Sequence, residues 1–193
     1  MLLAAVPASA QSPGRHVHEL SVARDMMGKN ADSAVLHARN ATRLASNDAQ
    51  RAEARELYGE ALRLAGDLTA AEVEYGLLLT QAQERRDEQL RGRALNGLGG
   101  VKRCFQQFDL ALGYHAEAFR LFDSLGNVAG AAQALHDLAL VLSDMGRTDE
   151  AMDLQQRALA MRTDENQRSG IAESHNSIGL LYCASGQLDS ALI

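Results

Sequence analysis

The chain has 193 residues, of which 46% are hydrophobic, 23% are charged and 4% are aromatic, with two prolines and no tryptophan. This composition is typical of a folded, helical protein rich in alanine and leucine, and it argues against a disordered one. The formal net charge is −6, from 25 acidic and 19 basic residues, and no basic run stands out, which argues against nucleic acid and anionic lipid as partners.

The N-terminus resembles the end of a secretory signal peptide. Residues 1–6 are apolar, Pro7 ends the run, and residues 8–10 are the small residues that a signal peptidase requires. The basic start of such signals is absent, which leaves two interpretations open: an exported chain whose start lies upstream, and a chance alanine-rich stretch in a cytoplasmic chain. We expect export, with 1–10 a signal remnant and 11–19 flexible. No later apolar run approaches the roughly 20 residues that span a bilayer.

Short segments of the sequence recur every 40 residues. The alanines of Phe108-Asp109-Leu110-Ala111-Leu112, Thr148-Asp149-Glu150-Ala151-Met152 and Leu188-Asp189-Ser190-Ala191-Leu192 show this step. The same step relates Leu98, Leu138 and Ile178; Gly99, Ala139 and Gly179; Ala118 and Ala158; and Gly130 and Gly170. Further matches lie upstream at Tyr58, Gly59, Gly66 and Ala71, and in Ala31-Asp32-Ser33-Ala34 at a slightly shorter offset. The repeats therefore begin near Leu20.

Each repeat unit is predicted to form two helices. Between about 89 and 105, apolar or small residues recur at helical spacing, and a polar turn at residues 106–107 follows. The next helix is predicted to end at Leu125-Gly126-Asn127, because glycine adopts the left-handed conformation that closes a helix. The stripes predicted to pack are Leu95, Leu98, Gly99 and Val101 on the first helix, and Leu112, Ala116, Phe119 and Phe122 on the second.

The following unit repeats this pattern around a turn at residues 145–147, Met-Gly-Arg. Thr148 or Asp149 is expected to cap the second helix, since a short side chain with an oxygen can accept a hydrogen bond from an exposed backbone amide. The predicted packing residues are Leu135, Leu138 and Val141 on the first helix, and Met152, Ala158 and Leu159 on the second.

Small residues are predicted where paired helices cross. Helix axes about 8 to 10 Å apart need small side chains at the crossing. Gly99, Ala139 and Gly179 are expected at this place on the first helices, facing Ala118 and Ala158 on the second helices.

This pattern resembles the tetratricopeptide repeat family, whose unit carries a Leu-Gly pair, an aromatic residue, a glycine turn and two alanines. The matching residues are Ile178-Gly179, Tyr182, Gly186 and Ala191 in the last unit, and Leu98-Gly99, Ala111 and Ala118 in an inner one. The resemblance covers residues 20–193 and implies an all-α fold, a right-handed α-solenoid of four to five stacked antiparallel helix pairs. Lys102 and Leu142 replace the aromatic residue, and the terminal proline of the family is missing.

The length of the repeat narrows the resemblance. The family unit has about 34 residues, whereas the step here is 40. Longer units resemble those of bacterial signalling regulators, kinesin light chains and the sensor regions of some histidine kinases and diguanylate cyclases. Solenoids normally end with a polar capping helix, and the sequence stops at Ile193 about one turn into a second helix. We therefore expect the natural protein to continue beyond this segment.

The candidate binding residues lie on the predicted first helices, which in such solenoids line a concave groove. Asn96, His136 and Asn176 form a ladder at the 40-residue step, and the resemblance implies that asparagines there bind the backbone of an extended peptide. Helical phase adds Arg93, Gln133 and Glu173 three places earlier, and Arg103 and Ser143 seven places later. The alternative is that all are solvated surface residues, because phase fixes a face and not a contact.

The sequence supports neither a metal nor a cofactor site. Zinc needs three or four converging ligands, commonly in short motifs, and His136 and His175 have no such context. The other histidines are predicted to be ordinary surface or packed residues, with His16 and His18 in the flexible segment. Cys104 and Cys183 lie two repeats apart, about 20 Å at ~10 Å per stacked helix, which is too far for a disulfide.

Catalysis is not predicted within this chain. Gly97, Gly99 and Gly100 follow no strand, which a phosphate-binding loop would require, and no serine lies in a Gly-x-Ser-x-Gly turn. The predicted function is a scaffold that binds a protein or an extended peptide, as the periplasmic or otherwise exported sensor region of a bacterial signalling protein of histidine kinase or diguanylate cyclase type. The alternative is a cytoplasmic regulator that binds a signalling peptide or a transcription-related partner. Incomplete end repeats could also associate with a second copy.

Overall fold

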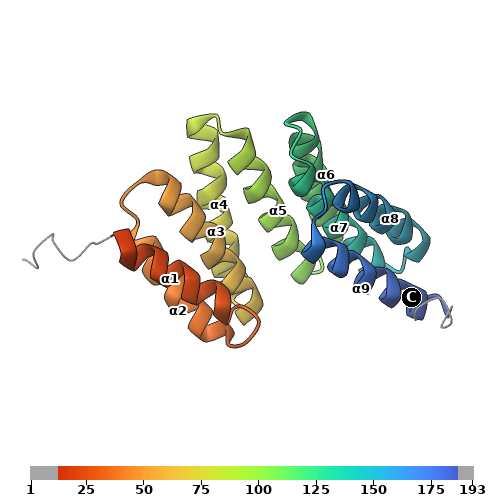
Figure 1. Ribbon diagram of the computed structural model, residues 1–193, viewed down its shortest axis with the longest axis horizontal. Coiled ribbons are helices and arrows are strands. Elements are labelled where there is room, and N and C mark those ends of the chain that lie inside the picture. The colour runs from red at the N-terminus through yellow and green to blue at the C-terminus, as the bar shows by residue number, and fades with distance from the viewer. Residues whose placement is uncertain (1–12, 187–193) are drawn as a thin grey trace, which may run out of the picture. The chain divides into compact units, whose positions relative to one another are not determined.

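The computed structural model describes residues 13–186, and all of its regular elements there are α-helices (Figure 1). The helices are α1 (Pro13–Met26), α2 (Ala31–Leu44), α3 (Asp48–Ala65), α4 (Leu68–Arg85), α5 (Glu88–Cys104), α6 (Phe108–Ser124), α7 (Val128–Asp144), α8 (Thr148–Asp164) and α9 (Arg168–Ala184). Within the described part of the chain, no helix is both long and apolar enough to cross a membrane. The segments 1–12 and 187–193, including the proposed signal remnant and Ala191, lie outside the described residues.

The chain divides into two compact units, residues 1–78 and 79–193. In the first unit α1 packs against α2, α2 against α3, and α1 also against α3. Four fully buried alanines, Ala23, Ala34, Ala38 and Ala61, form the centre of this packing. Such small side chains let the helix backbones approach closely.

The prediction that residues 11–19 are flexible is wrong for residues 13–19, which form the first half of α1. His16 and Leu20, one helical turn apart, are both buried in the first unit. The imidazole of His16 also donates from Nδ1 to the carbonyl oxygen of Ala41 in α2, at 2.9 Å. Tertiary packing therefore orders a segment that has little apolar periodicity of its own.

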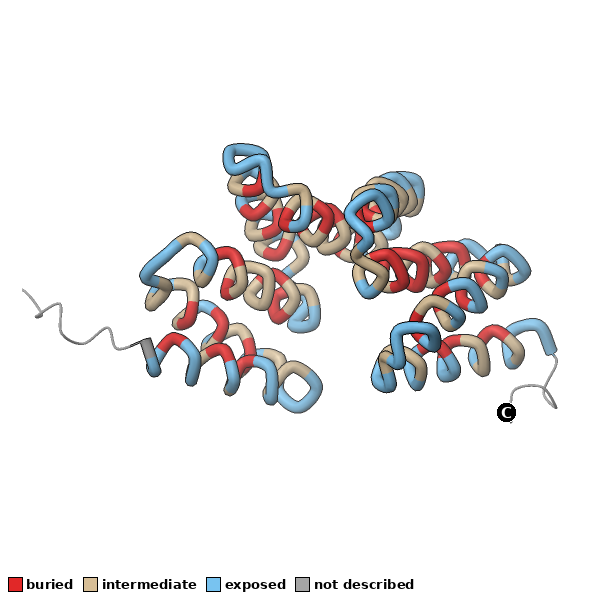
Figure 2. The backbone as a smooth tube through the Cα atoms, turned by 45° about the horizontal axis from the view of Figure 1, so that its top comes forward, coloured by how far each residue is buried: buried red, intermediate tan, exposed pale blue. Residues whose placement is uncertain are grey.

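The second unit contains α5 to α9, in which each helix packs against the next along the chain. In addition, the first helices of successive pairs pack together, α5 against α7 and α7 against α9. Buried residues follow the lines along which helices meet (Figure 2). One cluster joins Leu95, Ala118, Phe122, Ala131 and Ala134, from three successive helices. The predicted stack of antiparallel helix pairs is confirmed.

The helix ends follow the repeat. Residues with left-handed backbone after the first helices are Gly66, Gln106, Gly146 and Gly186, and those after the second helices are Arg86, Gly126 and Asn166, all at the same 40-residue step. At the end of α6, Gly126 N donates to Asp123 O and Asn127 N donates to Phe122 O, which satisfies carbonyl groups of the last turn. The predicted turns at 125–127 and 145–147 are confirmed.

The predicted side-chain cap of α8 is wrong. Neither Thr148 nor Asp149 caps this helix: the N-cap residue is Arg147, and it makes no side-chain capping bond. Thr148 is already helical, and Asp149 and Glu150 place carboxylates in the first turn, where the helix dipole favours negative charge. By contrast, Asn127 caps α7 by accepting from Gly130 N.

The small residues predicted at the crossings are in place. A Cβ atom on Gly99 would lie 2.6 Å from Cε1 of His115, and one on Gly59 would lie 2.9 Å from Cε2 of Tyr75. The two pairs differ by 40 residues at both positions, so they are the same crossing in successive repeats. Ala118 is fully buried as expected, but the side chain that faces Gly99 most closely is His115, which the sequence prediction did not identify.

The predicted apolar stripe of α6 is wrong in phase. Its buried residues are Ala111, His115, Ala118 and Phe122, so of the predicted stripe only Phe122 is fully buried. Leu112 and Phe119 are half-buried and pack against the edges of two core clusters. The closest contact line is occupied by small residues because the helices cross tightly there, and the larger side chains lie beside it.

We expect Gly99→Leu to lower the free energy of unfolding by about 1 to 3 kcal/mol, because overpacking a tight contact forces strain on both helices. The matched control is Gly113→Leu, since Gly113 is exposed inside α6 and a Cβ there would meet nothing within 4 Å. Urea unfolding followed by circular dichroism measures both variants. Equal stability of the two would contradict the proposed crossing.

Candidate binding face

Side chains on neighbouring first helices of the second unit are linked directly. Asn96 Nδ2 in α5 donates to Asp137 Oδ2 in α7, at 2.6 Å. One helix end further, Arg103 Nε donates to Asp144 Oδ2, also at 2.6 Å. Both links join residues 41 positions apart, so they run across the face that α5, α7 and α9 share. We call this surface the first-helix face.

A buried arginine joins this face from behind. Arg162 lies near the end of α8 and is 2% exposed. Its Nη1 donates to Gly170 O at 2.9 Å and to Ser174 Oγ at 2.8 Å, both in α9. Its Nη2 donates to Gln133 Oε1 in α7 at 2.7 Å and to Glu173 Oε2 in α9 at 2.9 Å. One guanidinium thus holds side chains of two successive first helices.

Arg162 occupies the repeat position that Phe122 occupies one step earlier. A Cβ on Gly130 would lie 2.7 Å from Phe122, and a Cβ on Gly170 would lie 2.9 Å from Arg162. The same crossing is therefore filled by an aromatic ring in one repeat and by a guanidinium in the next. The sequence analysis missed this residue, although the 40-residue step shows a charged residue aligned with an apolar core position.

A depression of about 470 Å³ opens on the first-helix face beside this guanidinium. Its lining comes from α7, α8, α9 and the turn before α9: Ala129, Gln133, Arg162, Gln167, Ser169, Gly170 and Glu173. It contains two of the residues predicted to bind a partner, Gln133 and Glu173. The side chain of Glu173 is 48% exposed, so its carboxylate is available at the surface while Arg162 fixes its position.

Polar side chains also pair across the helices of each hairpin. His115 Nδ1 donates to Asn96 Oδ1 at 2.7 Å. One step later, His136 Nδ1 lies 3.1 Å from the side-chain amide of Gln155. The histidine is on the second helix in the first pair and on the first helix in the other. The same interhelical contact is thus kept with its two partners exchanged.

Burial lowers the pKa of His115 below its usual value. The negative charge of Asp137 opposes this shift, and the positive charge of Arg103 adds to it. Neutral His115 is compatible with its hydrogen bond, because the ring donates to the Asn96 oxygen through a single N–H.

The structure separates the predicted binding residues into three groups. His136 is only 3% exposed, so its prediction as a surface contact is wrong, because its ring packs into the helix pair and lies 3.6 Å from Glu173 Oε1. Asn96 and Arg103 reach the face but are engaged with Asp137 and Asp144. Gln133 and Glu173 line the depression, Asn176 is exposed on α9, and Arg93 and Ser143 are half-buried on α5 and α7.

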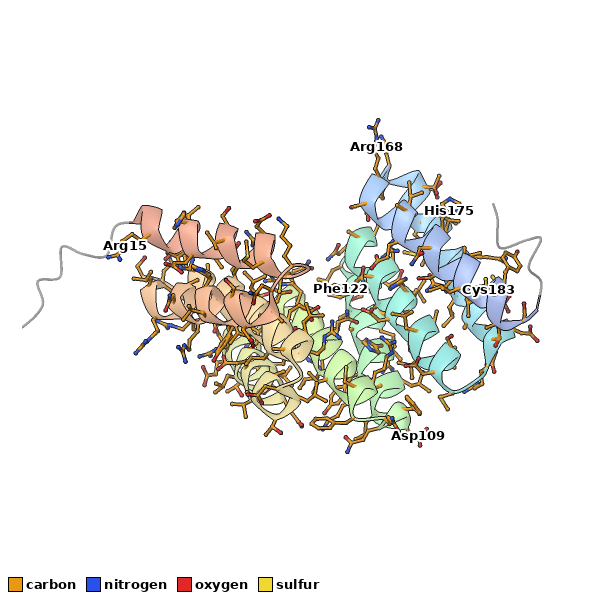
Figure 3. All side chains as sticks on the ribbon, turned by 90° about the horizontal axis from the view of Figure 1, so that it is seen from below. Arg15, Asp109, Phe122, Arg168, His175 and Cys183 are labelled. Atoms are coloured by element: carbon orange, nitrogen blue, oxygen red, sulfur yellow. The ribbon has the colours of Figure 1, made fainter. Side chains whose placement is uncertain are left out.

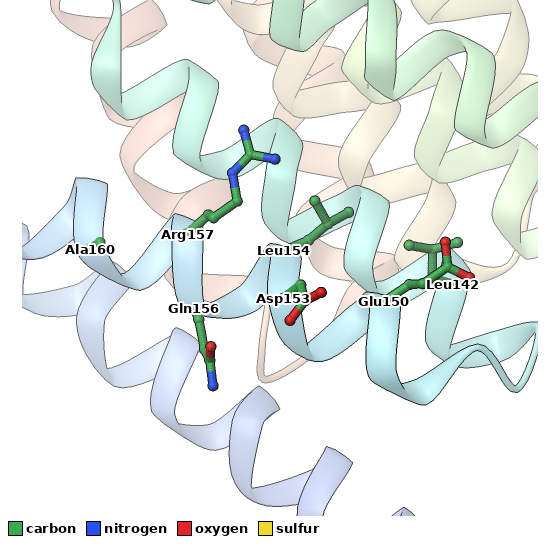
Figure 4. A pocket seen from close by; sticks show the side chains of 7 residues that line it. All are labelled: Leu142, Glu150, Asp153, Leu154, Gln156, Arg157 and Ala160. Atoms are coloured by element: carbon green, nitrogen blue, oxygen red, sulfur yellow. The ribbon is translucent and has the colours of Figure 1, made fainter.

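A second, shallower groove of about 670 Å³ runs along the other side of the hairpin α7–α8. Its lining residues are Leu142, Glu150, Asp153, Leu154, Gln156, Arg157 and Ala160. Leu154 and Arg157 point the same way from α8, while Gln156 points to the opposite side (Figure 4). The guanidinium of Arg157 lies 6.0 Å from the centre of the Phe119 ring, a cation–π distance. None of the predicted binding residues lies here.

The residues considered for metal or redox chemistry lie apart from this face's depression. Arg168, His175 and Cys183 are spaced along α9, and His175 and Cys183 are exposed (Figure 3). Cys104 and Cys183 are free thiols on α5 and α9. Across the described residues, His, Cys, Asp and Glu form no group of three that could hold a metal ion.

Sequence comparison now identifies the repeat. The model of the tetratricopeptide repeat family matches residues 90–164 and, one repeat on, residues 132–193. Together the matches span more than half of the chain. The chain belongs to the tetratricopeptide repeat family. None of the curated proteins is similar enough in sequence to count as a match.

Solved structures agree with the tetratricopeptide fold. A Rap protein complexed with Competence and Sporulation Factor has a TM-score of 0.82 and 16% identity, covering 95% of this chain and 54% of the Rap chain. The kinesin light chain repeats of Podosopora anserina have a TM-score of 0.65 and 15% identity, covering 94% and 92%. BtubC of P. vanneervenii has a TM-score of 0.66 and 20% identity, covering 96% and 87%. This tetratricopeptide chain therefore spans about half the length of the Rap protein.

We predict that acid weakens the second unit through His115. Because the folded-state pKa lies below the usual value of about 6.5, the unfolded chain binds the proton more readily. The stability that this provides is present above the usual pKa and is lost as the pH falls from there through the folded-state pKa. His115→Gln, which places the residue of position 155 at this crossing, should reduce the loss between about pH 7 and about pH 5.

The measurement is the free energy of unfolding at both pH values, from urea titrations. His18→Gln is the control, because His18 is exposed on α1. An unchanged pH dependence in His115→Gln would show that this imidazole does not titrate with folding.

Proposed function

We propose that this chain binds a protein partner, as an extended peptide or a helical segment, on the first-helix face of its second unit. The observation that carries the proposal is the depression in which Gln133 and Glu173 are held in place by the buried Arg162. Side chains whose position is fixed before binding lose less conformational entropy when a partner arrives.

The chemistry of the depression suits a polar backbone. Ser169 and Gln167 supply a hydroxyl and an amide, and Glu173 supplies a half-exposed carboxylate. Such groups accept from, and in part donate to, the amide and carbonyl groups of a peptide. Asn176 lies less than one helical turn beyond Glu173 and is exposed, so it extends the same polar surface along α9. Support of another kind comes from the similar Rap protein, which was solved as a complex with Competence and Sporulation Factor.

The wider role that we propose is that of the exported sensor region of a bacterial signalling protein, with a histidine kinase or diguanylate cyclase as the effector. Its support is the small-residue sequence at 8–10 together with the long repeat unit. The alternative is a cytoplasmic regulator, which keeps the same binding face and differs only in location and partner.

Binding is tested with a peptide display library selected against the whole chain, followed by titration of the best peptide. We expect Glu173→Gln combined with Asn176→Ala to weaken binding roughly tenfold or more, since each lost hydrogen bond contributes about 0.5 to 1.5 kcal/mol. Glutamine retains an oxygen for Arg162. The control is Gln156→Ala in the groove of Figure 4. Full affinity in the double variant, with unchanged helicity, would place the binding site elsewhere.

Export is tested by fusing residues 1–30, with any codons that precede them in frame, to a reporter that is active only after secretion. We expect an active fusion that is cleaved after Ala10, and an inactive one when Ala8 and Ala10 are both replaced by Arg, because signal peptidase requires small residues there. Retention of the unaltered fusion in the cytoplasm would favour the cytoplasmic alternative.

A further inference from the structure

A separate cavity of about 420 Å³ lies in the first unit, between α1 and α3. Its lining includes His16, Val17, Leu20 and Arg24 from α1, and Glu53 from α3. All of these residues belong to the unit formed by residues 1–78, so the cavity is independent of the first-helix face and of the function proposed for it.

His16 presents a hydrogen-bond acceptor that the described residues leave unsatisfied. Its side chain is 2% exposed, and Nδ1 lies 2.9 Å from the carbonyl oxygen of Ala41. A carbonyl oxygen only accepts, so Nδ1 carries the single N–H of the neutral ring. Nε2 is then a bare acceptor, and no described group is within hydrogen-bonding distance of this buried atom.

An acceptor in this situation needs a physical explanation. Burying a polar group without a partner costs free energy, and nearly all buried polar groups in folded proteins are paired. The other buried polar side chains follow this rule, as Gln155 and Arg162 show. The exception at His16 coincides with a cavity that the same residue lines. A donor from a ligand bound there would complete the pairing.

The rest of the lining selects the chemistry of this ligand. Val17 is 60% exposed and lies one turn from Arg24, while Leu20 forms an apolar wall. Arg24 Nη2 and Glu53 Oε1 form an ion pair of 2.6 Å, so the charged groups of the lining neutralise each other. A neutral ligand with an N–H donor beside an aliphatic group therefore fits better than an ion. A metal would find one imidazole and a carboxylate that is already engaged, which is too few ligands for zinc.

We propose that this cavity binds a short peptide segment, with a backbone N–H donating to His16 Nε2 and an aliphatic side chain packing on Val17 and Leu20. The two contacts belong to one amino-acid residue, because the amide and the side chain are attached to the same Cα. The site recognises an uncharged leucine-like residue within a chain.

The test uses the complete protein with ¹⁵N-labelled histidine and the probe N-acetyl-leucine N-methylamide. We expect a saturable change of the His16 Nε2 resonance in the NMR spectrum as the probe is added. The matched probe is N-acetyl-N-methyl-leucine dimethylamide, which has the same side chain and no N–H. We expect it to bind about fivefold more weakly, the loss of one hydrogen bond. No saturable change with the first probe, or equal affinity for both, would overturn the proposal.

Two variants assign the effect to His16. His16→Phe keeps an aromatic ring of similar size and removes both ring nitrogens, so binding of the first probe should fall to that of the matched probe. His18→Phe, at an exposed position of the same helix, should bind like the unaltered chain. Unchanged binding in His16→Phe would also overturn the proposal. The comparison of the two probes on the unaltered chain decides the matter if His16→Phe fails to fold.

Discussion

The structure depends on how closely the two helices of each pair cross. At Gly59 and Gly99 the neighbouring helix is so near that a Cβ atom would overlap Tyr75 or His115, and the next repeat has only Ala139 at this position. Close approach lets a large side chain of one helix lie over the backbone of the other. The stacking of pairs in each unit, and the direction in which polar side chains leave the core, both follow from this contact.

The tight crossing also explains why polar groups hold the first-helix face together. His115 lies against Gly99 and can therefore reach Asn96, and Asn96 in turn reaches Asp137 on the next first helix. Buried polar groups that all find partners favour one arrangement of the helices over others. The cost is that Asn96, a natural candidate for contacting a peptide, is already committed to interactions within the chain.

Arg162 gives the last described repeat a different character from the one before it. Where Phe122 fills its crossing with apolar atoms, Arg162 brings a charge that must be satisfied, and Gln133, Ser174 and Glu173 satisfy it. A buried charge left without such partners would be strongly destabilising. The acceptors gathered around it form the wall of a surface depression. The need to pair one buried guanidinium thus shapes the most polar part of the face.

The sequence by itself determined the helix pairs, their 40-residue step, the left-handed turns at Gly126 and Gly146 and the small residues at the crossings, because periodicity and glycine act through local backbone geometry. Only the tertiary structure decided that α1 includes residues 13–19, that the buried stripe of α6 runs through His115, and that His136 points inward. It also brought Arg162 to Gln133 across 29 positions. Helical phase assigns a residue to a face, but the neighbouring helix determines which side chain on that face is buried, paired or left exposed to a partner.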